Sequence, residues 1–143
     1  MYTAIIIEDE YPAILRLKHM VSLHSDAITL LTHADTGRAG IDSVNKLRPD
    51  VIFLDIHLPD MTGFEVLNAL DYHPMVIFTT AYAEYAVQAF EVFSVDYLVK
   101  PFEESRFRKA IEKIAHFQPL ESPPDYAKLA TLFIEAQSKP KQT

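Results

Sequence analysis

Acidic residues end two of the most hydrophobic segments of this 143-residue chain. Residues 51–54 form a continuous apolar run that leads into Asp55, and residues 4–7 form another that leads into Glu8 and Asp9. Carboxylates gathered at one place repel one another unless a cation binds between them. Their hard oxygens suit Mg²⁺, which keeps several waters and bridges to phosphate oxygens. Together with a lysine and a threonine that end later strands, Lys100 and Thr80, these acids suggest phosphoryl transfer to an aspartate, with a metal ion neutralising charge on the transferred group.

The elements that would position these acids follow from hydrophobic patterning. A short uninterrupted apolar run predicts a strand buried on both faces, as in a parallel sheet. On this basis strands are expected at residues 4–7, 27–32, 51–54, 75–78 and 95–99. Apolar residues at helical spacing predict helices at residues 11–24, 39–47, 64–70, 84–90 and 106–117, with a further short helix at 126–137.

Strict alternation of strands and helices predicts an α/β fold with a five-stranded parallel sheet and helices on both faces. The flavodoxin-like strand order 2-1-3-4-5 is expected, in which the first and third strands are neighbours. Glu8, Asp9 and Asp55 would then meet at one edge of the sheet. Thr80 and Lys100 end the fourth and fifth strands and would close the site, with a hydroxyl donor and a positive charge for a phosphoryl group.

Four segments in this order resemble the receiver domain of bacterial two-component response regulators. They are Ile-Ile-Ile-Glu-Asp at 5–9, Leu-Asp at 54–55 with Pro59 and Gly63, Thr-Ala at 80–81, and Tyr-Leu-Val-Lys-Pro-Phe at 97–102. The resemblance covers residues 3 to about 117 and implies a CheY-like fold. Residues 80–91 followed by 95–97 are also similar to receivers of LytTR-type (LytR/AlgR-like) regulators.

The resemblance implies a role for each acid of the site. Asp55 would be the phosphoacceptor and Asp9 a direct Mg²⁺ ligand. Glu8 would act mostly through metal-bound water, and the backbone carbonyl of His57 would complete the protein's ligands. Glu8 departs from the aspartate that is commoner at this position.

The remaining motif residues would read the phosphorylation state. By resemblance Lys100 contacts the phosphoryl group, Thr80 turns toward it, and Tyr97 changes rotamer with Thr80. The bond before Pro101 is often cis in this family. The protein would be a signalling switch rather than an enzyme, with self-catalysed phosphotransfer and slow autodephosphorylation.

The resemblance also implies partners and a domain organisation. A histidine kinase or phosphotransfer protein would supply the phosphoryl group, and a homodimer would form through the fourth helix, fifth strand and fifth helix. The receiver would span residues 1–118, with a linker and short helical tail at 119–143. Regulators of the LytTR type usually bind DNA through a C-terminal domain, which lies outside this sequence. The chain is thus either a fragment of a transcription regulator or a stand-alone receiver in a phosphorelay.

Simpler interpretations stay open for individual residues. Asp55 alone could be a helix or turn cap, Thr79 competes with Thr80, and Glu10 competes with Glu8. The ring of His57 is interpreted as a solvated loop group rather than a metal ligand. Either plain core packing or a dimer face fits Phe90, Val92, Phe93 and Val95.

Two other functions use the same kind of fold or intermediate. A haloacid-dehalogenase-like phosphotransferase needs a second acid two residues after its nucleophile, and His57 stands there. A flavodoxin-like electron carrier would bring an FMN phosphate against Glu8, Asp9 and Glu10, which would repel it.

Bulk properties narrow the class further. The net charge of −7 argues against nucleic-acid binding by this chain itself, and the absence of cysteine excludes disulfides and thiolate chemistry. No basic leader precedes the first strand, and no apolar run reaches membrane-spanning length. A cytoplasmic protein without a membrane partner is expected.

Overall fold

Five parallel strands form the centre of the protein, in a computed structural model that describes residues 1–81, 93–118, 122 and 124–138. The strands are β1 (Tyr2–Ile7), β2 (Ile28–Ala34), β3 (Val51–Asp55), β4 (Met75–Thr80) and β5 (Asp96–Val99). They lie in the order β2-β1-β3-β4-β5, which confirms the predicted topology.

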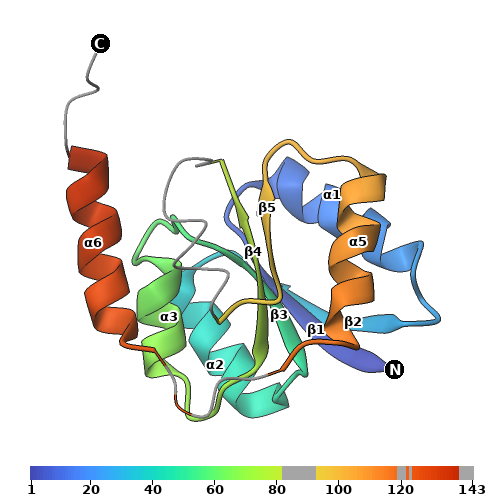
Figure 1. Cartoon of the computed structure of the whole chain (residues 1–143), viewed down its shortest axis with the longest axis horizontal. Coiled ribbons are helices and arrows are strands. Elements are labelled where there is room, and N and C mark those ends of the chain that lie inside the picture. Colours follow the sequence, from blue (N-terminus) through green and yellow to red (C-terminus); the bar gives the residue numbers. More distant parts are fainter. Residues whose placement is uncertain (82–92, 119–121, 123, 139–143) are drawn as a thin grey trace.

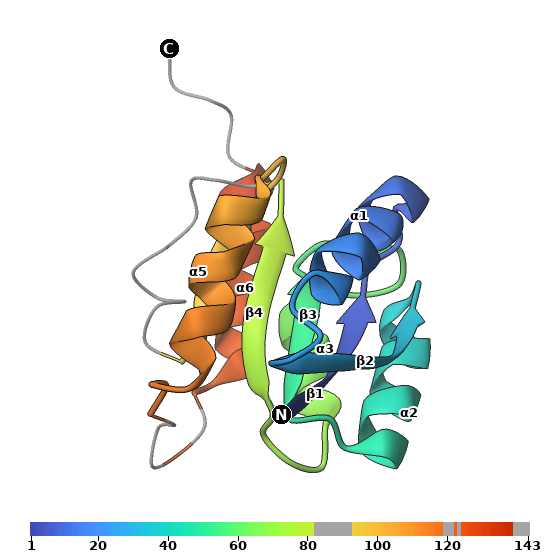
Figure 2. The same ribbon diagram turned by 90° about the vertical axis from the view of Figure 1, so that its right-hand side faces the viewer.

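Helices cover both faces of this sheet. They are α1 (Tyr11–Ser22), α2 (Gly37–Leu47), α3 (Gly63–Ala69), α5 (Glu104–Ile114) and α6 (Tyr126–Ser138). Two views at right angles show α1 and α5 on one face, and α2, α3 and α6 on the other (Figures 1 and 2). The helix predicted at residues 84–90 lies outside the described residues.

The two faces of the central strand β3 pack into two separate hydrophobic clusters. Ile52 and Leu54 belong to the cluster shared with α2 and α3, whereas Phe53 packs toward α5, where its ring stacks on Phe107 at 5.5 Å. All five residues of β3 are buried. The uninterrupted apolar run was therefore a correct signal of a strand covered on both sides.

Strand β2 lies at the edge of the sheet, as its alternating sequence suggested. Its burial pattern alternates along residues 28–34, and it pairs with β1. The strand runs to Ala34, beyond the predicted end at residue 32, because parallel pairing with β1 continues to Ile7. At the opposite edge β5 begins at Asp96, one residue later than predicted.

Helices α1 and α5 end earlier than their apolar patterns predicted. After Ser22, the amide of His24 donates to the carbonyl of Val21 at 2.9 Å. After Ile114, the amide of Phe117 donates to the carbonyl of Ile114 at 3.3 Å. Such i to i−3 bonds tighten the last turn and satisfy terminal carbonyls without extending the α-helix.

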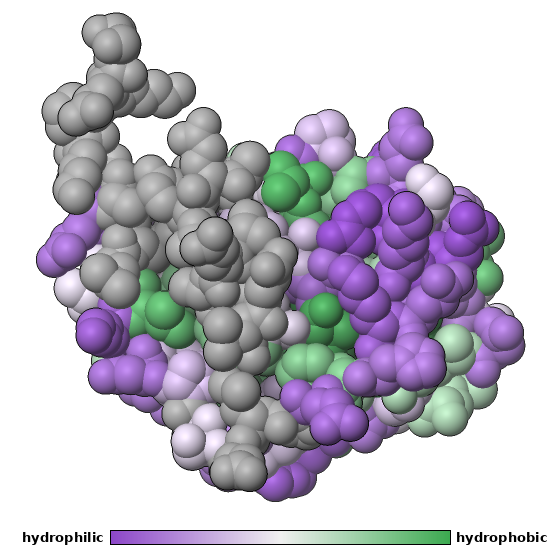
Figure 3. Space-filling model, in the orientation of Figure 1, coloured by the Kyte–Doolittle hydropathy of each residue, from purple (hydrophilic) through white to green (hydrophobic). Residues whose placement is uncertain are grey.

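Helix α5 shows how an amphipathic pattern positions an element of the site. Phe107, Ala110, Ile111 and Ile114 are buried against the sheet. On the face seen in Figure 3, hydrophilic side chains gather over the outer side of α5 and α1. Burial of the apolar stripe fixes α5 beside β5, and so fixes the segment around Lys100 that joins them. Among the described residues, no helix combines the length and apolar character that crossing a membrane requires.

Candidate functional site

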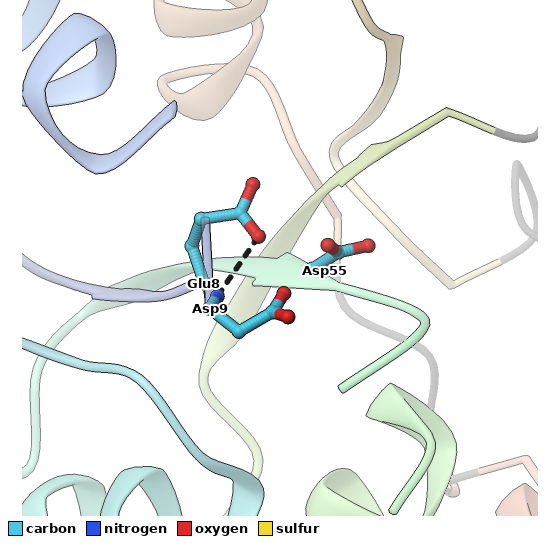
Figure 4. Close-up of side chains that lie close together, drawn as sticks. All are labelled: Glu8, Asp9 and Asp55. Carbon is cyan, nitrogen blue, oxygen red and sulfur yellow. Dashed lines mark hydrogen bonds between the residues drawn. The ribbon is translucent and has the colours of Figure 1, made fainter. Parts of the chain in front are cut away.

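Three carboxyl groups meet at the carboxyl ends of β1 and β3. Glu8, Asp9 and Asp55 each offer an oxygen, and these oxygens lie within 4.8 Å of one another (Figure 4). The parallel pairing of Ile7 with Leu54 brings the acids that follow them to the same edge of the sheet. The predicted convergence of these residues is confirmed.

The three acids differ in their exposure to solvent. The side chains of Glu8 and Asp55 are buried, while Asp9 is exposed. The backbone amide of Asp9 donates to Glu8 Oε2 at 3.0 Å, which turns one Glu8 oxygen back toward its own strand (Figure 4). Asp9 is therefore the member of the cluster that faces solvent, from which an ion would arrive.

Lys100 brings a positive charge to the same edge from the end of β5. Its Nζ contacts the Glu8 carboxylate and lies 3.1 Å from Asp55 Oδ2. Its backbone amide donates to the carbonyl of Thr80 at 2.7 Å, which continues the pairing of β4 with β5. The Lys100–Pro101 peptide bond is cis, as the resemblance suggested.

The charges of this cluster are unbalanced. Burial, and then the neighbouring Asp55, raise the pKa of Glu8 to about 8, although Lys100 acts in the opposite direction. Burial works against the charged form of Lys100, but contacts with Glu8 and Asp55 raise its pKa overall. One ammonium group thus serves several carboxyl oxygens. The atoms that could bind a metal are hard carboxyl oxygens, and those of Asp9 are exposed to solvent. This set fits a small divalent cation such as Mg²⁺.

The loop after β3 is held close to the phosphoacceptor candidate. The backbone amide of His57 donates to Asp55 Oδ1 at 3.3 Å, while the His57 side chain is exposed. A Cβ on Gly63 would lie 2.7 Å from the Asp55 carbonyl oxygen, so only glycine allows α3 to begin there. Thr62 and Glu65 form a capping box that fixes this start.

A second contact holds the loop after β3 in place, and it was not predicted from the sequence. Asp60 accepts hydrogen bonds from the amides of Gly37 at 2.7 Å and Arg38 at 2.9 Å, at the N-terminus of α2. These bonds lower the pKa of Asp60 despite opposing desolvation. The contact joins residues far apart in sequence, so local patterns do not reveal it. The one hint in the sequence was Gly37, because a side chain there would collide with Met61 of this loop.

The two threonines at the end of β4 occupy different surroundings. Thr79 pairs in register with Asp55, and within the described part of the chain its buried hydroxyl has no hydrogen-bond partner. Thr80 is fully buried and pairs with Val99. The structure thus brings Thr80 to the predicted edge, and the choice of Thr80 over Thr79 as the phosphoryl contact stays a prediction.

Tyr97 is buried in this structure. Its side chain is 6% exposed, its ring lies 6.2 Å from that of Phe78, and burial followed by the charge of Asp55 raises its pKa to about 12. The predicted change of rotamer stays a prediction. The observed position is the inward one, facing the α3 side of the sheet.

A further buried acid lies at the start of β5, and sequence reasoning assigned it only to a strand. Arg106 donates two hydrogen bonds of 2.7 Å to the oxygens of Asp96, and Lys113 Nζ lies 3.2 Å away. Burial alone would raise the pKa of Asp96, but these cations and the amide of Tyr97 lower it overall. The two cations compensate the buried carboxylate, and their contacts anchor α5 to the sheet.

The fold and the acidic edge define a class of signalling protein. The model of the response regulator receiver domain matches residues 4–112, and the chain belongs to that family. Receiver domains act as signalling switches and not as true enzymes. A haloacid-dehalogenase-like enzyme and a flavodoxin-like electron carrier do not belong to this family.

Named relatives agree with this assignment. The chain is 41% identical to an uncharacterized response regulatory protein of Vibrio vulnificus over 117 residues, which are 80% of this chain and 48% of that protein. It is 39% identical to the transcriptional regulatory protein BtsR of Escherichia coli over 116 residues, 80% of this chain and 48% of BtsR. The chain thus spans about half the length of these curated relatives.

Solved structures give the same result for the fold. The response regulatory domain of protein mrkE from Klebsiella pneumoniae superposes with a TM-score of 0.69 at 32% identity, covering 80% of this chain and 95% of that domain. The receiver domain of NarL from Mycobacterium tuberculosis superposes with a TM-score of 0.71 at 24% identity, covering 82% and 98%, and supports the fold alone.

Proposed function

We propose that this receiver accepts a phosphoryl group on Asp55 from a histidine kinase or phosphotransfer protein in the presence of Mg²⁺. The observation that carries the proposal is the convergence of Glu8, Asp9 and Asp55, with Lys100 Nζ 3.1 Å from Asp55. A single buried aspartate beside a lysine and two further acids is suited to nucleophilic phosphoryl transfer.

In the proposed reaction an Asp55 carboxylate oxygen attacks phosphorus, and the phosphorus–nitrogen bond of the donor phosphohistidine breaks. The imidazole leaves with the bonding electron pair and takes up a proton. Lys100 holds a positive charge beside the accepting oxygen. Mg²⁺ would be held by the side chains of Asp9 and Asp55, by the His57 carbonyl and, through water, by Glu8. The ion would neutralise charge on the transferred group.

The same residues would convert phosphorylation into a change of packing. Phosphoryl oxygens would draw in the Thr80 hydroxyl and the Lys100 ammonium. Movement of Thr80 favours the inward position of Tyr97, whose ring fills the space toward Phe78. The receiver thus has two packings, and phosphorylation favours the one with Tyr97 inward. Dimerisation through the fourth helix, β5 and α5 would then follow. Of the four residues named for that face in the sequence, Phe90 and Val92 lie outside the described residues.

The wider role that we propose is transcription regulation through a LytTR-type DNA-binding domain, which lies outside this chain. Relatives of about twice this length, one of them named a transcriptional regulatory protein, support that proposal. A stand-alone receiver that passes a phosphoryl group on by protein–protein contact is the alternative.

The phosphosite can be tested with acetyl phosphate as the donor. Asp55→Asn should abolish phosphorylation, because its amide is not a nucleophilic oxyanion. Asp42→Asn, on the exposed surface of α2, is the matched control and should be phosphorylated like wild type. Intact-protein mass spectrometry with and without Mg²⁺ gives the readout. Equal phosphate uptake by Asp55→Asn and wild type would overturn the assignment.

The switch can be tested with beryllofluoride and Mg²⁺, which mimic the phosphorylated state. Wild type should dimerise more strongly with beryllofluoride in sedimentation velocity. Thr80→Ala should still be phosphorylated but should dimerise less, and Thr79→Val serves as the comparison. If Thr80→Ala dimerises as well as wild type, this description of the switch is wrong.

A further inference from the structure

Helix α6 is an element that the receiver fold does not explain. The family match ends at residue 112, whereas α6 spans Tyr126–Ser138. The helix nevertheless packs against α3, on the face of the sheet that also carries α2 (Figures 1 and 2). The chain returns after α5 to the opposite face, so this contact places a C-terminal segment on the receiver.

The docked face of α6 follows a helical spacing. Tyr126 and Ala130 are buried and Leu129 is partly buried, and all three belong to the hydrophobic cluster that contains Phe64 of α3. Ile134 is 50% exposed. Asp125 fixes the start of the helix, because its carboxylate accepts from the amide of Lys128 at 3.0 Å. The packing is therefore specific to one apolar stripe.

Tyr126 links this helix to the switch residues through aromatic contacts. Its ring lies 5.6 Å from Phe93 in an edge-on arrangement. The ring of Phe93 lies 5.8 Å from Phe78, which in turn lies 6.2 Å from Tyr97. Phe78 is in β4, two residues before Thr80. A continuous row of packed rings thus joins α6 to Tyr97, the residue proposed to change position with Thr80.

We propose that the surface formed by α3 and Phe93 is a docking site for α6 of the same chain, and that its occupancy is coupled to the phosphorylation state of Asp55. This inference rests on the proposed function, because it takes the acidic edge as the site where the signal arrives. The ligand of this surface is an amphipathic helix that presents a tyrosine and a small residue one turn apart.

The direction of the coupling follows from the position of Tyr97. Tyr97 is inward in the structure in which α6 is docked, so both belong to the same packing of Phe78 and Phe93. Phosphorylation favours the inward Tyr97, and it therefore strengthens the docking of α6. Coupling between two sites is reciprocal: removal of α6 from its surface must weaken the binding of a phosphoryl mimic by the same factor.

Hydrogen exchange measures how a phosphoryl mimic at Asp55 changes the docking of α6. Backbone amides of α6 should exchange more slowly when beryllofluoride and Mg²⁺ are bound, by about fivefold or more, the lower end of typical coupling between sites. Mass spectrometry of peptides from residues 126–138 gives the rates. Asp55→Asn, which cannot form the aspartyl adduct, should show no change and serves as the negative control.

Two neighbouring substitutions measure how the docking of α6 changes the binding of beryllofluoride. Ala130→Glu places a carboxylate in the buried contact with α3, whereas Thr131→Glu makes the same change one residue along, on the exposed side of α6. Ala130→Glu should raise the half-saturating beryllofluoride concentration about fivefold or more, and Thr131→Glu should leave it unchanged. Tyr126→Leu, a milder variant that keeps an apolar contact without the ring packing on Phe93, should have a smaller effect of the same sign.

The outcomes separate this inference from the function on which it rests. If Asp55 takes up phosphate normally but α6 exchanges at the same rate in both states, the coupling is absent and the inference is wrong. Equal beryllofluoride affinity of Ala130→Glu and Thr131→Glu would also overturn it. If wild type forms no adduct at Asp55, the proposed function itself fails. If Ala130→Glu lowers the thermal midpoint of the whole domain, the beryllofluoride affinity of Tyr126→Leu decides instead. An affinity equal to that of wild type would then overturn the inference.

Discussion

Buried acidic residues lie at both ends of β5, in opposite electrostatic surroundings. At its start, the buried carboxylate of Asp96 receives two hydrogen bonds from Arg106 and a contact from Lys113. Just beyond its end, Lys100 meets Glu8 and Asp55, with Asp9 close by. The pKa of Asp96 is lowered, whereas the pKa of Glu8 is raised to about 8.

The balance of charge around each acid separates a structural ion pair from a functional one. Around Asp96 two cations surround one carboxylate, so its burial is compensated within the protein. Around Glu8 several carboxyl oxygens share one ammonium, so burial stays costly until another cation arrives. Perturbed groups of the second kind are typical of sites that bind or react. Burial of an acid is therefore uninformative until its neighbours are counted.

The largest expected effect is on stability, at the balanced end of β5. Asp96→Asn should lower the free energy of unfolding by about 2–3 kcal/mol, below the 3–5 kcal/mol for fully buried pairs because the guanidinium of Arg106 still reaches water. Asp71→Asn breaks an exposed pair with Arg48 of the same 2.7 Å length and should cost less than about 1 kcal/mol. Urea unfolding gives both values, and equal losses would contradict the distinction.

A smaller effect is expected from pH at the unbalanced end. The folded pKa of Glu8, about 8, lies above its ordinary 4.5, so the folded state holds a proton that the unfolded chain releases. Stability should then fall as pH rises from about 5 to 8 in metal-free buffer. Glu8→Gln stays neutral and should lack this part of the slope. A difference of about 2 kcal/mol is expected, since one pKa unit corresponds to 1.36 kcal/mol and solvent at the exposed Asp9 screens part of it.

This pH prediction is checked by urea unfolding of wild type and Glu8→Gln at several pH values. The difference between the two proteins isolates the contribution of Glu8, because every other titratable group is present in both. Parallel stability curves across this range would show that the folded Glu8 carboxyl has an ordinary proton affinity.

The smallest effect concerns stabilisation by the metal. Mg²⁺ at ten times its dissociation constant should stabilise wild type by about 1.4 kcal/mol, because it binds the folded state. Asp9→Ala should lose most of this gain, while Glu10→Ala, its exposed neighbour, should keep it. Thermal midpoints with and without Mg²⁺ test this. Full stabilisation of Asp9→Ala would mean that Glu8 and Glu10 hold the ion.

The sheet and the acidic edge were predictable because their signals are local. Continuous apolar runs identify strands buried on both faces, and the runs at residues 4–7 and 51–54 are each followed at once by an acid of the site, as in Leu54 and Asp55. Parallel pairing then brings strand ends together without further information. The same reasoning placed Glu8, Asp9 and Lys100 at one edge, where the structure has them.

Features that depend on contacts between distant segments could not be predicted. The amphipathic pattern of residues 126–137 indicated a helix but contained no information about which surface it covers, and α3 became known as its partner only from the structure. The bonds from α2 to Asp60 join residues 37 and 60, and the pairing of Asp96 with Arg106 depends on how α5 lies on the sheet. Such contacts follow from tertiary packing and leave no periodic signal in either segment.

The contrast between the two ends of β5 is tested most directly by titrating their carboxyl groups in one sample. The ¹³C chemical shifts of Glu8 and Asp96 can be followed by NMR over pH in wild type, with and without Mg²⁺. Without Mg²⁺, Glu8 should titrate near pH 8 and Asp96 below its ordinary 3.8; Mg²⁺ should move Glu8 to lower pH and leave Asp96 unchanged. A Glu8 carboxyl that titrates near 4.5 and does not respond to Mg²⁺ would contradict the assignment of this edge as an unbalanced, cation-binding site.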